Sequence, residues 1–165
     1  MRTRARLLGH PIHPMLIVFP LGLLATSLIF DVVHGVTENG AWSGIAYYLI
    51  GAGLIGGLLA AVFGLIDWLS IPKNTRAKRI GAYHGLVNVG VVGLFAISFA
   101  LRDSAPLSPP VIAYVLSALG GAVALVGGWL GGELVDRMGV GVDDGAHLDA
   151  PSSLARAVKI PVRKS

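Results

Sequence analysis

Four long stretches of this chain contain no aspartate, glutamate, lysine or arginine. They cover residues 7–30, 39–66, 80–101 and 104–132 of 165. Each is long enough to supply about 20 apolar residues, which at 1.5 Å per helical residue cross a hydrocarbon core of roughly 30 Å. Only 13% of residues are charged, about half the share usual in soluble domains. The sequence therefore predicts an all-α integral membrane protein, a bundle of four transmembrane helices whose first partner is the lipid bilayer.

Prolines and charged residues mark the ends of these spans. We expect the spans at about 14–33, 42–66, 80–101 and 111–134, within a transmembrane domain formed by residues 1–142. Pro20 lies inside the first span and should kink it, because proline removes one helical hydrogen bond. Residues 143–165 are expected to form a cytoplasmic tail that is partly flexible.

The basic residues predict how the bundle is oriented. Twelve of the thirteen lysines and arginines lie before the first span, between the second and third, or after the fourth, and Arg102 is the exception. Cytoplasmic loops of membrane proteins carry such an excess, so both termini are predicted to be cytoplasmic. This topology explains the formal charge of +4 without a nucleic-acid partner.

Several polar side chains fall near the cytoplasmic ends of the predicted spans. An ionisable side chain at the centre of a membrane helix costs about 2.5–3.5 kcal/mol, so each needs a partner or a role. We predict a cluster formed by His10, His13, Asp67 and His84, in which Asp67 hydrogen-bonds to His84. Asn88 supports the cluster because it lies four residues after His84 and so shares its helix face.

Two of these histidines belong to a motif rich in proline. His10 and His13 each precede a proline in the segment His-Pro-Ile-His-Pro, residues 10–14. A residue before proline is biased towards extended geometry. The segment is therefore predicted to be a stiff, non-helical start to the first span from which both imidazoles project, either as ligands or as hydrated interfacial groups.

The chemistry of the cluster favours a metal or a haem. Three neutral imidazoles and a carboxylate suit zinc, iron or a similar transition metal, and the chain has no cysteine to supply thiolates. The alternative cofactor is haem b, with His13 and His84 as its two axial ligands. The predicted role is electron transfer or metal handling. No hydrolase motif is present, so the sequence favours a protein that is not an enzyme, with a redox activity left open.

Two other functions remain open at this stage. In the first, the protein is a membrane anchor or assembly subunit, and the polar residues only clasp helices together. In the second, it is an oligomeric transporter or channel subunit whose polar path includes Asp67, His84 and Asn88.

Other polar and small residues give weaker indications. Asp31, near the outer end of the first span, has only Arg102 as a cation on its own side. Glu133 either caps the cytoplasmic cluster or ends the fourth span in water. Glycines spaced four apart indicate close helix packing, within one chain or in a homo-oligomer. A duplication of a two-helix unit is conceivable, but no motif shared by the two halves is evident.

The same residues resemble those of a family of bacterial membrane proteins known as domain of unknown function 2231. The resemblance covers most of residues 8–142, and its most specific part is the His-Pro-x-His-Pro motif. The other matching residues are Asp31, Gly64, Asp67, Arg79, His84 through Asn88, and the segments 131–135 and 139–142. The resemblance implies a bacterial inner-membrane location. Because some similar domains are joined to Rieske-type iron–sulfur domains, it also implies a redox setting, in which this cysteine-free chain would need a separate redox protein.

Overall fold

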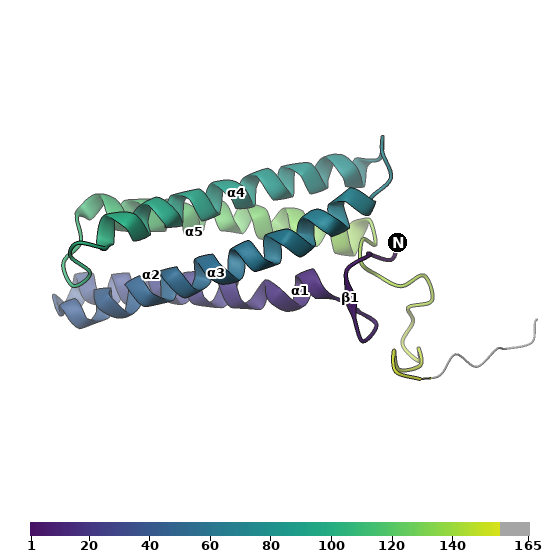
Figure 1. The fold of residues 1–165 in the computed structure, drawn as a ribbon, viewed down its shortest axis with the longest axis horizontal. Helices are drawn as coiled ribbons and strands as arrows, with labels where there is room; N and C mark the ends of the chain where they lie inside the picture. Colours follow the sequence, from purple (N-terminus) through teal and green to yellow (C-terminus); the bar gives the residue numbers. More distant parts are fainter. Residues whose placement is uncertain (156–165) are drawn as a thin grey trace, which may run out of the picture.

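The computed structural model describes residues 1–155, so the last ten residues of the predicted tail lie outside the described part (Figure 1). Within these described residues, four helical segments are long and apolar enough to cross a membrane, which confirms the predicted fold class. They span Ile12–Thr37, Gly40–Ser70, Arg76–Arg102 and Val111–Arg137. The individual elements are α1 (Ile12–Leu16), α2 (Val18–Thr37), α3 (Gly40–Ser70), α4 (Arg76–Arg102), α5 (Val111–Gly132) and a π-helical turn, η1 (Glu133–Arg137).

The first membrane segment is interrupted at Ile17, between α1 and α2. Pro20 explains the position of the break. Its ring clashes with the carbonyl of the residue four positions earlier, and it has no N–H to bond that carbonyl. The disturbance predicted for Pro20 therefore lies one turn before it, at Leu16 and Ile17.

A short β-hairpin precedes α1. Strand β1 (Arg6–Leu7) pairs antiparallel with β2 (His10–Pro11). The two-residue turn needs positive φ at both positions, 50° at Leu8 and 87° at Gly9, and glycine adopts such angles at low cost. Helix α1 already begins at Ile12, so the prediction that residues 10–14 are entirely non-helical is wrong for Ile12, His13 and Pro14. The first turn of a helix tolerates proline because its N–H has no helical partner there.

The four long helices form two antiparallel hairpins, α2 with α3 and α4 with α5 (Figure 1). The N-terminal segment and the residues that follow η1 lie at the same end of the bundle. They meet directly, since the N-terminal ammonium of Met1 donates to the carbonyl of Gly139 over 3.0 Å. The buried core between the hairpins is small. It consists of Leu24, Ile50, Val91 and Phe95.

The two hairpins share sequence motifs at equivalent positions, so the expectation that the two halves have no motif in common is wrong. Residues 22–27 (GLLATS) match residues 93–98 (GLFAIS) at an offset of 71, and residues 45–49 (IAYYL) match residues 112–116 (IAYVL) at an offset of 67. The equivalent residues are His13 and His84, Ser27 and Ser98, Asp31 and Arg102, Tyr47 and Tyr114, Gly53 and Gly120, and Gly64 and Gly131.

Packing inside the two hairpins follows the same equivalence. A Cβ atom added to Gly53 would lie 2.7 Å from Cδ2 of Leu24, and one added to Gly120 would lie 2.8 Å from Cε2 of Phe95. Leu24 and Phe95 are themselves equivalent. Both hairpins run in the same direction, as parallel repeats do in other membrane proteins.

Candidate functional site

His13 is held between α1 and α3. Its Nδ1 lies 2.8 Å from the carbonyl oxygen of Ala60. The imidazole packs over Gly64, where an added Cβ would lie 2.9 Å from Cε1 of the ring. Only glycine leaves this space free, so the small residue on α3 allows the ring to reach its carbonyl partner.

His84 repeats this arrangement between α4 and α5. Its Nδ1 lies 3.0 Å from the carbonyl oxygen of Gly127, and the ring packs over Gly131, where an added Cβ would lie 3.3 Å from Cε1. Asn88 adds a contact without an equivalent in the first hairpin. Its amide donates to the backbone carbonyl of His84 over 2.8 Å and lies 3.4 Å from Nε2.

The two histidines face each other across the bundle. Their ring centroids are 6.3 Å apart, and the ring planes are nearly perpendicular, at 86°. Both residues are half-buried. A neutral imidazole that donates Nδ1–H to a carbonyl leaves Nε2 as a bare acceptor or metal ligand. The geometry thus provides two equivalent imidazoles whose Nδ1 atoms are already engaged.

Asp67 has a partner different from the one that the sequence suggested. Its carboxylate is buried, and Oδ1 accepts a hydrogen bond from the backbone N–H of Ala5 over 3.1 Å. The predicted bond to His84 is therefore wrong, because the nitrogens of His84 contact Gly127 and Asn88 instead. The N-terminal segment folds back over the end of α3 and brings a backbone donor to the carboxylate.

His10 lies on the hairpin and is exposed, with Nε2 at 3.2 Å from Oγ of Ser153. Within residues 1–155, no three histidine, aspartate or glutamate side chains come close enough together to hold a metal ion. Of the four predicted ligands, the structure brings only the rings of His13 and His84 close to each other.

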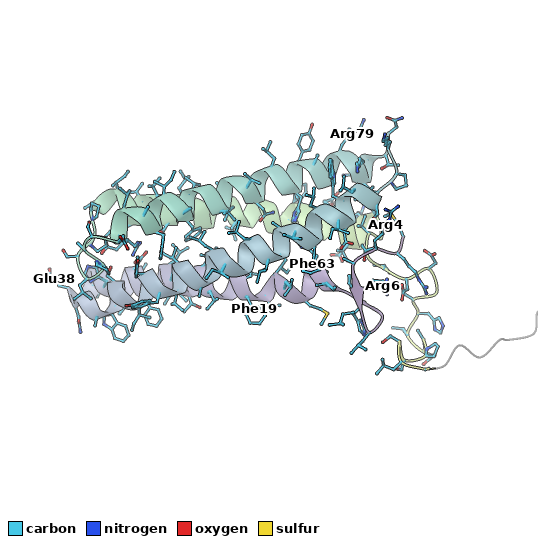
Figure 2. All side chains as sticks on the ribbon, viewed as in Figure 1. Arg4, Arg6, Phe19, Glu38, Phe63 and Arg79 are labelled. Carbon is cyan, nitrogen blue, oxygen red and sulfur yellow. The ribbon has the colours of Figure 1, made fainter. Side chains whose placement is uncertain are left out.

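The two supporting residues at this end lie on the bundle surface. Glu133 does not end the fourth span free in water, because its Oε2 accepts from Arg76 over 2.7 Å. Arg79 is exposed and projects from the end of α4 (Figure 2).

The pairing of Asp31 with Arg102 is confirmed at the opposite end. Two hydrogen bonds of 2.7 and 2.6 Å join the guanidinium to the carboxylate, and the side chain of Arg102 is fully buried. Ser98 and Ser117 accept further hydrogen bonds from the guanidinium, which also lies 4.8 Å from the ring centre of Tyr114. The sequence analysis did not predict this network. Its one signal in the sequence is Ser98, four residues before Arg102 and so on the same helix face.

Comparison with known proteins gives the family. Residues 9–144 match the model of the family described as "Predicted membrane protein (DUF2231)". This match covers most of the chain, which therefore belongs to that family of membrane proteins. No curated protein and no solved structure matches the chain.

Proposed function

We propose that this membrane protein binds one haem b between His13 and His84 and serves electron transfer. The observation that supports this proposal is the pair itself. Two imidazoles from repeated hairpins face each other, and each is oriented by a backbone carbonyl through Nδ1. Histidines that bind metals have this kind of partner behind them, because it fixes the tautomer and the ring orientation.

The two rings lie close enough together that His13 and His84 would hold the same haem iron. The centroids of His13 and His84 are 6.3 Å apart. The Nε2 atoms would hold the iron, since the Nδ1 atoms lie at carbonyl oxygens. The amide of Asn88, 3.4 Å from Nε2 of His84, would have to turn away from that nitrogen.

A haem suits this donor set better than a bare zinc or iron ion. Zinc sites use four ligands, or three and a water, whereas no third histidine, aspartate or glutamate joins the pair within the described residues. Haem iron takes its other four nitrogens from the porphyrin and needs only two from the protein. Glycines lie beside both rings, at Gly64 and Gly131. The absence of side chains at these positions would leave space for the porphyrin.

The roles of the chain and the cofactor are separable. Haem supplies one-electron chemistry when it is bound. His13 and His84 hold and orient it, Ala60 and Gly127 fix the imidazoles, and the surrounding helices limit access of water. With cytoplasmic termini in a bacterial inner membrane, the pair lies near the cytoplasmic side, where a separate redox protein can exchange electrons with it.

The visible spectrum of the purified protein tests this proposal. After expression with haem precursor and purification in mild detergent, we expect one haem b per chain, with a reduced spectrum typical of two axial histidines. His13→Ala and His84→Ala should each abolish that spectrum. His10→Ala and His34→Ala are matched controls that should retain it, because these side chains contact Ser153 and Asn39 instead.

Other outcomes would contradict the proposal. A colourless protein, with or without bound zinc, would exclude haem b. If His13→Ala and His84→Ala only lower stability in a protein that binds nothing, the histidines are helix clasps and the anchor or assembly function is favoured. Ion flux in liposomes by a colourless oligomer would favour the transporter.

A further inference from the structure

A groove opens between α2 and α5, near the end of the bundle opposite the histidine pair. Its volume is about 440 Å³, which falls in the usual range for small-molecule sites. The surface of the groove is mostly apolar, and its polar lining residues are Asp31, His34 and Tyr114. Its lining residues are Leu28, Asp31, Val32, His34, Gly35, Tyr114 and Ala118.

In the repeat, the interface between α3 and α4 is equivalent to the one between α2 and α5, and an aromatic side chain fills it. Between α3 and α4, the ring of Phe99 stacks on Tyr47 with centroids 4.5 Å apart and planes 4° apart. Phe99 also rests on Gly51, where an added Cβ would lie 2.9 Å from the ring. A planar six-membered ring therefore occupies this position in the closed interface.

At the groove, the residues equivalent to Phe99 and Gly51 are different ones. Leu28 is equivalent to Phe99, and Ala118 is equivalent to Gly51. The tip of Leu28 packs towards Gly121. Tyr114, the equivalent of Tyr47, is engaged by Arg102 and by the ring of His34 at 5.8 Å. The equivalents of Phe99, Tyr47 and Gly51 thus all line the groove.

His34, one of the lining residues, provides a hydrogen-bond acceptor. Nδ1 of His34 lies 3.0 Å from the carbonyl oxygen of Asn39, which holds the proton on Nδ1 and leaves Nε2 as an acceptor. Asp31 also lines the groove, but both of its carboxylate oxygens are bonded to Arg102. A ligand that fits this groove therefore has a planar ring, a donor for His34 and an apolar tail that suits the lipid.

We infer that the groove between α2 and α5 binds an isoprenoid hydroquinone of the membrane, with its ring in the space equivalent to Phe99 and a hydroxyl donating to His34. The reduced form is specified because a hydroquinone has hydroxyl donors and the corresponding quinone has only acceptors. This inference does not depend on haem at the histidine pair. It concerns binding alone.

Titration calorimetry in detergent tests the inference, with a benzohydroquinone that carries a ten-carbon tail as the probe. The wild-type protein should bind one probe per chain. It should bind the matching quinone about tenfold more weakly, since one hydrogen bond to His34 is lost. His34→Phe should remove that preference between the two redox forms.

Two substitutions fill the groove from opposite helices. Leu28→Phe supplies the missing ring from α2, and Ala118→Leu adds bulk from α5 at an exposed position. Each should weaken binding of the hydroquinone by about tenfold or more. Leu86→Phe makes the same change as Leu28→Phe on the exposed face of α4 and should leave binding unchanged.

Three results would overturn the inference. They are no binding by the wild type, an affinity in Leu28→Phe and Ala118→Leu that is unchanged from the wild type, or a phospholipid that occupies the groove after purification and excludes the probe. A folding defect in Leu28→Phe is detected by unfolding in detergent. Ala118→Leu then decides the question, because its side chain is exposed.

Discussion

Replacing Arg102 with alanine should lower the free energy of unfolding by about 3–5 kcal/mol. The guanidinium is fully buried and makes two hydrogen bonds to the carboxylate of Asp31. Truncating it leaves that carboxylate buried without its cation, which is the costly case for an ion pair away from water. The oxygens of Ser98 and Ser117 lose a donor as well. Unfolding by a denaturing detergent, followed by far-ultraviolet circular dichroism, measures the change.

Two comparisons make this prediction specific. Arg76→Ala removes a pair whose arginine is 58% exposed, so it should cost less than about 1 kcal/mol. The double variant Asp31→Leu with Arg102→Leu should be more stable than Arg102→Ala, because no unpaired charge remains. If Arg102→Ala costs no more than Arg76→Ala, the buried pair does not stabilise the bundle as described.

Gly64→Ala should displace the ring of His13 and reduce haem content about fivefold or more. The added Cβ would lie 2.9 Å from Cε1 and 3.0 Å from Nδ1 of the imidazole, and such overpacking costs about 1–3 kcal/mol. The ring must then leave its position at the carbonyl of Ala60. Haem content per chain, measured as the pyridine complex, reports the loss.

Equivalent glycines in the second hairpin provide a graded series. Gly131→Ala should reduce haem content less, because its Cβ would lie 3.3 Å from Cε1 of His84. Gly128→Ala should have no effect, since nothing lies within 4 Å of the added atom. Equal haem content in the three variants would show that close packing on glycine does not position the histidines.

The spans could be predicted because a charge-free, apolar stretch long enough to cross a bilayer indicates a transmembrane helix. The pairing of Asp31 with Arg102 was also predictable, since Arg102 is the sole basic residue on that side of the predicted topology. The partner of Asp67 was not predictable. It is the backbone N–H of Ala5, and its position depends on how the N-terminal segment folds back over the bundle.

The repeat escaped sequence reasoning for two physical reasons. Its equivalent residues Asp31 and Arg102 carry opposite charges because they form an ion pair with each other, and this difference hides their equivalence in the sequence. The offset also changes from 71 to 67 within the hairpin, because Tyr47 follows Asp31 by 16 positions whereas Tyr114 follows Arg102 by only 12. Knowing the helix pairing reveals the equivalence of His13 and His84, and with it the two-histidine site.

The most direct test of the central claim is the electron paramagnetic resonance spectrum of the ferric protein at low temperature. Joint ligation by His13 and His84 predicts a low-spin haem signal with two axial imidazoles in the wild type. In His13→Ala and in His84→Ala, any haem that remains should give a high-spin signal. A high-spin signal in the wild type, or a low-spin signal that persists in both variants, would contradict the proposal that these two histidines share one iron.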